Sequence, residues 1–168
     1  MSINQIAKTI QGIVFDVDGV LTNGRIIYSD CGVETKHFHV RDGASIKLLA
    51  NKGIEIAIIT GRESTMVSRR AEELGIVHVV QGADSKTDAL QTLMDNGFPS
   101  QNLCAIGDDI QDLQLFNHPS ITLRATVADA HPVVLAKADF TTLRGGGEGV
   151  ALELAELILK AQGKWDFD

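Results

Sequence analysis

The sequence predicts an α/β fold in which one parallel sheet lies between two layers of helices. Two observations predict it: short apolar runs bounded by turn residues recur along the chain, and stretches with helical periodicity lie between them. Strands that alternate with helices in this way pair in parallel through crossover connections, and the helices then cover the sheet. Ligands of such sheets bind beyond the carboxyl ends of the strands.

The individual elements follow from local patterns. Five apolar runs are predicted to be buried strands, and they cover residues 13–15, 54–59, 77–80, 103–106 and 121–123. Helices are predicted over residues 64–74, 85–96 and 150–161, because each of these stretches has a helical pattern that ends close to a glycine.

One segment departs from the alternation of strands and helices. The stretches 24–28 and 34–40 are strand-like and flank turn residues at 29–32, which predicts a β-hairpin inserted after the first strand, over about residues 24–40. No internal repeat or linker divides the chain. We therefore expect a single domain over residues 1–168, with a short C-terminal tail at 163–168.

The composition excludes several classes of protein. The chain has no apolar stretch of the roughly 18 residues that a membrane span needs, and its N-terminus has no apolar leader segment. We therefore expect a cytoplasmic protein that does not bind membranes. The net charge of −7 disfavours binding to nucleic acid, which needs basic surface. Cys31 and Cys104 are expected to be free thiols.

The clearest chemical signal comes directly after the first predicted strand. Asp16 and Asp18 are two residues apart, and Gly19 allows the backbone to bend after them. Two carboxylates this close repel each other unless a cation or a raised pKa relieves the repulsion, and Mg²⁺ is the cation that oxygen ligands of this kind suit best. Taken alone, the motif is about as typical of a polar turn as of a metal site.

Three later features also follow predicted strands. Thr60 comes after the second core strand, Lys86 begins the helix after the third, and three acids at Asp108, Asp109 and Asp112 follow the fourth. A hydroxyl and an ammonium at strand ends can bind phosphoryl oxygens, and clustered acids can hold a cation or cap a helix.

The order of these motifs resembles the haloacid dehalogenase superfamily of phosphotransferases. The stretches at 19–22, 38–43, 59–62 and 127–132 are also similar to the 3-deoxy-D-manno-octulosonate 8-phosphate phosphatases, a resemblance that covers about residues 10–163. It implies a three-layer Rossmann-like sheet without a cap domain and a homotetramer whose hairpins meet. It also implies hydrolysis of an acid-sugar phosphate in the synthesis of a lipopolysaccharide inner-core precursor.

The resemblance further implies roles for the motif residues. Asp16 would attack phosphorus, and Asp18 would act as general acid and then as general base. Mg²⁺ would be held by Asp16, by the backbone carbonyl of Asp18 and by Asp108, with Asp109 and Asp112 supporting these ligands. The phosphoryl group would be bound by Thr60 and Lys86. The sugar acid would be contacted by Asp18 and Lys86 and, in part across a subunit boundary, by His39, Val40, Arg41, Asp42, Gly43, Lys47, Arg62 and Arg70.

Some positions depart from that family. Its members usually carry arginines where this chain has Glu148 and Leu152, commonly an Asp where it has Asn23, and a bulky residue and a Gly in place of Ala44 and Ser45. These differences leave a nine-carbon acid-sugar 9-phosphate open as an alternative substrate. A receiver-type domain that accepts a phosphoryl group without turnover and an inactive tetramer with a regulatory role also stay open as functions.

Overall fold

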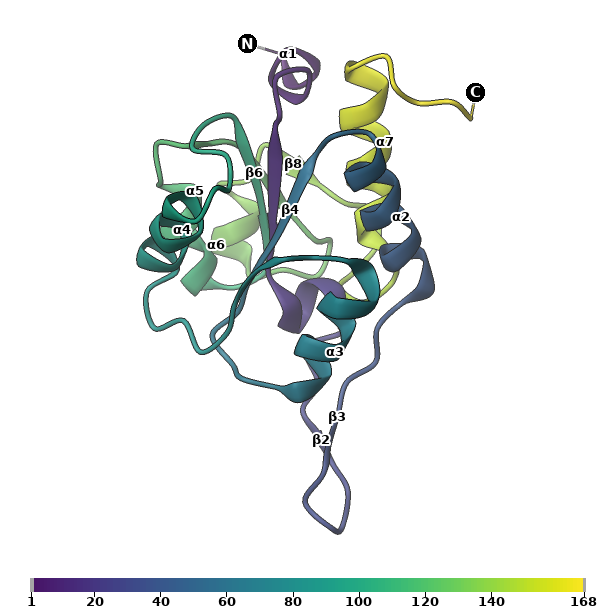
Figure 1. The fold of residues 1–168 in the computed structure, drawn as a ribbon, viewed down its shortest axis with the longest axis vertical. Coiled ribbons are helices and arrows are strands. Elements are labelled where there is room, and N and C mark those ends of the chain that lie inside the picture. Colours follow the sequence, from purple (N-terminus) through teal and green to yellow (C-terminus); the bar gives the residue numbers. More distant parts are fainter. Residues whose placement is uncertain (1, 168) are drawn as a thin grey trace.

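The core of the protein is a six-stranded parallel sheet, seen in a computed structural model that describes residues 2–167 (Figure 1). The strand order is β5-β4-β1-β6-β7-β8, with all five pairs parallel. The strands are β1 (Gly12–Phe15), β4 (Glu55–Ile59), β5 (His78–Val80), β6 (Leu103–Gly107), β7 (Ile121–Thr126) and β8 (Phe140–Thr141). The predicted fold class is confirmed. Residues 1 and 168, the ends of the predicted domain and tail, lie outside the described residues.

Helices cover both faces of this sheet (Figure 1). Three of them lie on one side, namely α2 (Val40–Asn51), α3 (Thr65–Leu74) and α7 (Val150–Ala161), and α1 (Ile3–Ala7) contacts α7. The other side carries α4 (Lys86–Asp95), α5 (Leu113–Phe116) and α6 (Pro132–Leu135). Because helices cover both faces, β1 and β6 are buried along their whole length, which explains why they are continuous apolar runs in the sequence.

The predicted helices begin and end where their capping residues indicate. The hydroxyl of Ser64 accepts a hydrogen bond from the backbone N–H of Met66, and that of Ser85 accepts one from Asp88. Gly75 ends α3 with a φ of 73°, in the left-handed region that glycine adopts without strain. Among residues 2–167, no helix combines the length and hydropathy needed to cross a bilayer.

The hairpin forms a separate two-stranded antiparallel sheet that projects from the end of the main sheet opposite to both termini (Figure 1). Its strands, β2 (Ile27–Tyr28) and β3 (Glu34–Thr35), are shorter than predicted. The strand-like stretch up to residue 40 does not continue as a strand, because the chain turns into α2 at Val40. There the ring of His39 accepts a hydrogen bond from the backbone N–H of Arg41.

Candidate active site

Polar side chains gather in a cleft at the carboxyl ends of β1, β4 and β6, next to the hairpin. This is the edge of a parallel sheet at which ligands bind. The cleft is lined by Asp16, Asp18, Gly24, Thr60, Gly61, Arg62, Ala83, Asp84, Lys86, Asp108, Asp109, Gln111 and Asp112. The motif residues that follow separate strands in the sequence are therefore brought together.

Lys86 lies between two acids at the bottom of the cleft. Its ammonium is 2.7 Å from Asp16 Oδ1 and 2.5 Å from Asp112 Oδ1, and all three side chains are buried. Burial alone would lower the pKa of Lys86, but the charges of Asp16 and Asp112 outweigh it and raise the pKa. Lys86 therefore stays charged, and a single ammonium is shared by two carboxylates.

The carboxylates of this cluster repel one another when all are ionised, because they share only the one ammonium of Lys86. Burial, and then the nearby charge of Asp112, raise the pKa of Asp16 to about 7 despite the opposing effect of Lys86. Burial, and then the charge of Asp16, raise the pKa of Asp108 to about 7. Such a cluster stores electrostatic repulsion that an added cation would relieve.

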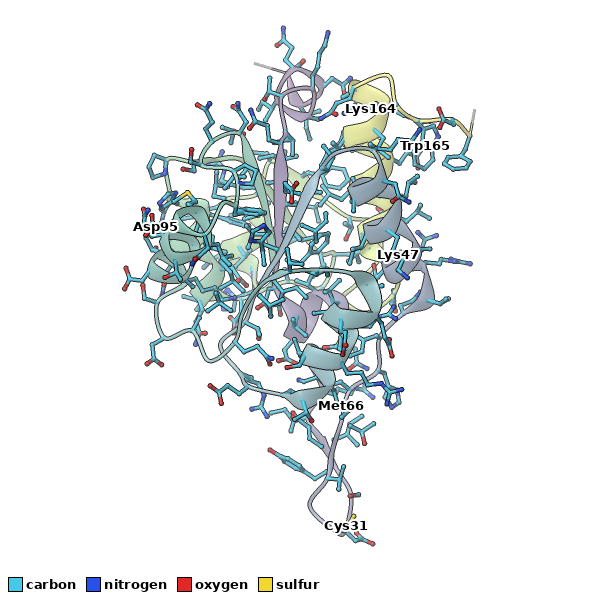
Figure 2. All side chains as sticks on the ribbon, viewed as in Figure 1. Cys31, Lys47, Met66, Asp95, Lys164 and Trp165 are labelled. Atoms are coloured by element: carbon cyan, nitrogen blue, oxygen red, sulfur yellow. The ribbon has the colours of Figure 1, made fainter. Side chains whose placement is uncertain are left out.

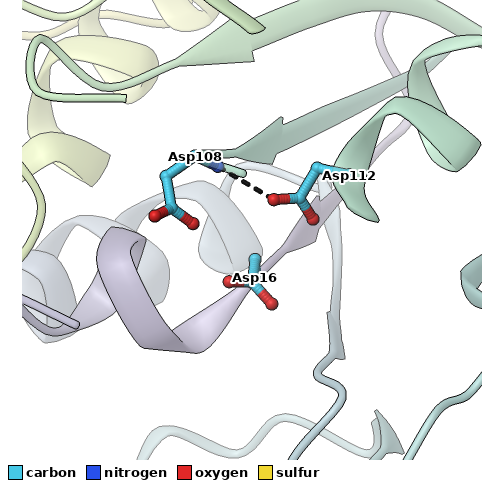
Figure 3. A group of neighbouring side chains, drawn as sticks. All are labelled: Asp16, Asp108 and Asp112. Carbon is cyan, nitrogen blue, oxygen red and sulfur yellow. Dashed lines mark hydrogen bonds between the residues drawn. The ribbon is translucent and has the colours of Figure 1, made fainter. Parts of the chain in front are cut away.

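The carboxylates of Asp16, Asp108 and Asp112 point toward one another (Figure 3), and each offers an oxygen within 4.8 Å of the others. Asp112 already uses both oxygens: Oδ1 faces Lys86, and Oδ2 accepts hydrogen bonds from the backbone N–H groups of Asp108 and Asp109 at 2.9 and 3.1 Å. Asp16 and Asp108 are therefore the carboxylates whose oxygens could hold a cation directly. Oxygen donors of this kind fit Mg²⁺, with Asp112 orienting the loop that carries Asp108.

Metal binding at this cluster should depend on pH in a defined direction. Between about pH 4 and pH 7, the folded metal-free protein holds protons on Asp16 and Asp108 that the unfolded chain releases, so the stability from these groups is lost as the pH rises toward 7. Mg²⁺ competes with those protons. We expect Mg²⁺ to raise the Tm more at about pH 8 than at about pH 5.5. Differential scanning fluorimetry checks this, and equal shifts at both values would contradict it.

The turn that carries Asp18 is built around glycines. Residues Val17–Leu21 form a wide helical turn with a kink, at which Gly19 has a φ of 96°. A Cβ placed on Gly19 would lie 2.0 Å from Asp108 Oδ2, and one placed on Gly146 would lie 1.9 Å from the carbonyl oxygen of Gly19. The glycine-rich segment 145–149 therefore packs directly on the Asp18–Gly19 turn.

Gly19→Ala is expected to displace Asp108 and to weaken Mg²⁺ binding by about tenfold or more, with a stability loss of about 2 kcal/mol. Gly53→Ala is the matched control, because Gly53 also has a positive φ (85°) but no atom within 4 Å of an added Cβ. The control should lose about 1 kcal/mol and keep its Mg²⁺ affinity. Calorimetric Mg²⁺ titration measures the affinity of both variants, and thermal unfolding measures their stability. Wild-type Mg²⁺ affinity in Gly19→Ala would refute this geometry.

Thr60 and Arg62 lie where β4 ends, at the opposite wall of the cleft from Asp108. Thr60 is buried, and its Oγ1 is 3.5 Å from the backbone nitrogen of Arg62. The guanidinium of Arg62 pairs with Glu34 of the hairpin at 2.9 Å. Both residues line the cleft as the sequence predicts.

The other residues expected to contact a sugar acid do not line this cleft within one described chain. Asp42 is buried, and its Oδ1 accepts a hydrogen bond from the backbone N–H of Ala151 at the start of α7. Arg70 lies over the ring of Phe38, with its guanidinium carbon 5.8 Å from the ring centroid, and pairs with Glu73. Lys47 points outward from α2 (Figure 2). His39, Val40, Arg41 and Gly43 are also absent from the cleft lining in residues 2–167.

Sequence reasoning missed several residues of the site. Asp84 and Gln111 line the cleft, although the sequence patterns around Lys86 and Asp108 give them no role. Lys36 forms an ion pair with Asp18 through its Nζ and Asp18 Oδ1, and Glu34 lies beside it. Glu34 and Lys36 are two residues apart, so an extended backbone places both side chains on one face, but this spacing does not indicate that the face meets the cleft.

Comparisons with known proteins identify the family of this chain. Residues 75–154 match the family model of the haloacid dehalogenase-like hydrolases. The 3-deoxy-D-manno-octulosonate 8-phosphate phosphatase of Salmonella typhi is 40% identical over 161 residues, which cover 95% of this chain and 85% of that relative. This chain belongs to the 3-deoxy-D-manno-octulosonate 8-phosphate phosphatase family.

Solved structures of this phosphatase family share the whole fold. The Moraxella catarrhalis enzyme, crystallised with a magnesium ion, a phosphate ion and KDO, is 44% identical with a TM-score of 0.91 over 98% of this chain and 94% of its own. The cobalt-bound Haemophilus influenzae phosphatase is 36% identical with a TM-score of 0.90, over 98% and 96% of the two chains. The phosphatase fold expected from the sequence, a Rossmann-like sheet without a cap domain, is thus confirmed.

Proposed function

We propose that this chain is a Mg²⁺-dependent phosphatase that converts 3-deoxy-D-manno-octulosonate 8-phosphate to 3-deoxy-D-manno-octulosonate and phosphate. The observation that carries the proposal is the cluster of Asp16, Lys86, Asp108 and Thr60 at neighbouring strand ends, in a chain 44% identical to a phosphatase crystallised with magnesium, phosphate and KDO. The reaction serves the synthesis of a lipopolysaccharide inner-core precursor.

The first half of the reaction is phosphoryl transfer to Asp16. A carboxylate oxygen of Asp16 attacks phosphorus while the bond to the sugar oxygen breaks, leaving an aspartyl phosphate. Lys86, 2.7 Å from Asp16 Oδ1, and the Thr60 hydroxyl bind phosphoryl oxygens and offset their charge. Bound Mg²⁺, held by Asp16, the backbone carbonyl of Asp18 and Asp108, supplies the remaining charge neutralisation.

Asp18 moves protons in both halves of the reaction. It gives a proton to the departing sugar oxygen and later takes one from the water that hydrolyses the aspartyl phosphate. This cycle distinguishes an enzyme from a receiver-type domain, in which the aspartyl phosphate would persist. An inactive tetramer is disfavoured because every side chain that the chemistry needs is present at the cleft.

The proposal extends to assembly. We infer a single-domain cytoplasmic protein that forms a homotetramer through its hairpins, whose apolar residues Ile26, Ile27, Tyr28 and Val33 are exposed in the single chain. A neighbouring subunit would then bring residues from the segment 39–43, Lys47 or Arg70 toward the cleft. Sedimentation analysis checks this assembly, and a monomer at micromolar concentration would contradict it.

The identity of the sugar phosphate is the part of the proposal that most needs a direct test. Glu148 accepts a hydrogen bond from the backbone N–H of Gly145, at a position where the family usually has an arginine. A nine-carbon acid-sugar 9-phosphate is therefore the second candidate. A panel of sugar phosphates ranked by kcat/KM decides between them. We expect the octulosonate 8-phosphate to rank first, and a preference for monoesters without a carboxylate would overturn the acid-sugar assignment.

A further inference from the structure

The stem of the hairpin reaches into the active site through one side chain. Lys36 follows β3, and its ammonium forms an ion pair with Oδ1 of Asp18 on the turn after β1. The Lys36 side chain is only 2% exposed, whereas that of Asp18 is 20% exposed. The charge of a lysine enclosed in this way is stabilised by the carboxylates that it contacts, because little water reaches it.

Lys36 engages one oxygen of Asp18 and leaves the other without a donor. Oδ2 of Asp18 is buried and accepts no hydrogen bond from the residues that the structure describes. A carboxylate held through one oxygen by an ammonium has a defined orientation, and here the second oxygen has no protein donor. A group that transfers protons needs a defined direction, and the ion pair with Lys36 sets the orientation of the Asp18 carboxylate.

Glu34 of β3, two residues before Lys36, is a second carboxylate beside the Lys36 ammonium. Its Oε1 lies 3.6 Å from Lys36 Nζ and 2.9 Å from Nη2 of Arg62, which lines the cleft. The guanidinium of Arg62 lowers the pKa of Glu34, so this carboxylate stays ionised beside Lys36. The chain of contacts from Arg62 through Glu34 and Lys36 to Asp18 connects the residues that follow β4 and β1 to the hairpin stem.

We propose that Lys36 is a positioning residue that orients Asp18 for proton transfer, so that the hairpin stem is part of the catalytic machinery. The inference rests on the proposed phosphatase function and deepens it. Lys36 acts through Asp18 and not on the substrate, since its own side chain is almost fully enclosed. A misplacement of Asp18 by about 1 Å is enough to cost about 10²-fold in rate.

The test compares two esters that differ in how much they need a general acid. The p-nitrophenolate ion leaves without protonation, whereas the alkoxide of a sugar does not. Lys36→Met is expected to lower kcat/KM for the preferred sugar phosphate by about 10²-fold, and that for p-nitrophenyl phosphate by less than about fivefold. Lys36→Arg, which keeps a cation, should stay within about tenfold of the wild type on both esters.

A double-mutant cycle separates positioning from substrate binding. If Lys36 acts through Asp18, then Lys36→Met adds no further loss to an Asp18→Asn variant. Lys52→Met is the matched control, because Lys52 pairs with Asp166 on the surface, away from the cleft, and it should leave all rates unchanged. Thermal unfolding verifies that each variant folds, and Lys36→Arg carries the test if Lys36→Met does not.

Additive losses in the cycle, or equal losses on both esters, would overturn the role of Lys36. The same would follow if Lys36→Arg, the fallback variant, lost more than about tenfold in kcat/KM equally on both esters. Failure of the proposed function gives a different result, since the wild-type protein with Mg²⁺ would then release no phosphate from either ester.

Discussion

Asp16→Asn is expected to lower kcat by at least about 10⁴-fold while leaving the fold intact. The amide has nearly the shape of the carboxylate but is not a nucleophile, and it still offers an oxygen to the ammonium of Lys86 at 2.7 Å. Phosphate release from the sugar phosphate with saturating Mg²⁺ is the measurement. Asp95→Asn is the control, because Asp95 lies on the outer side of α4 (Figure 2) and should have no effect.

The same variant separates the enzyme from a non-enzymatic phosphoacceptor. If the protein were a receiver-type domain, the wild type would take up at most one phosphoryl group per chain and would show no turnover. Many turnovers in the wild type and none in Asp16→Asn support the phosphatase. Residual turnover within tenfold of the wild type would show that another group attacks phosphorus.

Lys86→Met is the second substitution with a large expected effect, on both rate and stability. It removes the ammonium that Asp16 and Asp112 share, so two buried carboxylates lose their common partner. Loss of a buried partner of this kind costs about 3 kcal/mol of stability in the metal-free protein. The loss of charge stabilisation in phosphoryl transfer should lower kcat/KM by about 10³-fold.

Two measurements check this prediction. Urea unfolding of metal-free Lys86→Met should show the loss of stability, and added Mg²⁺ should restore part of it, because the cation takes over part of the charge balance. The exposed Lys137, changed to Met, is the control for loss of a lysine. Unchanged stability together with unchanged kcat/KM in Lys86→Met would contradict the shared-ammonium geometry.

Much of the fold follows from local patterns. The strands around the site are continuous apolar runs because helices cover both faces, and Ser64, Ser85 and Gly75 mark helix ends through their own hydrogen bonds and φ preference. The two-residue strand β8 has no such signal, since a run of that length shows no periodicity. α2 was not predicted because Gly43 and Ser45 in its first turns are poor helix formers, and its packing against α7 is a tertiary contact that no local pattern shows.

The site residues that directly follow predicted strands could be predicted from the sequence. Asp16, Thr60, Lys86 and Asp108 each follow a strand, and parallel strands bring their carboxyl ends together. The ion pair between Lys36 and Asp18 spans 18 positions and depends on how the hairpin folds back, which no local pattern encodes. The burial of Asp42 under the start of α7 likewise depends on tertiary packing.

The most direct test of the account is the identification of the phosphorylated residue. Wild-type protein and an Asp18→Asn variant, which should hydrolyse the aspartyl phosphate slowly, would be mixed with substrate and Mg²⁺, quenched in acid, digested and analysed by mass spectrometry. The account predicts one acid-stable, hydroxylamine-sensitive phosphoryl group on the peptide that contains Asp16, accumulating in the Asp18→Asn variant. A phosphoryl group on another residue, or rapid turnover without any phosphorylated peptide, would contradict it.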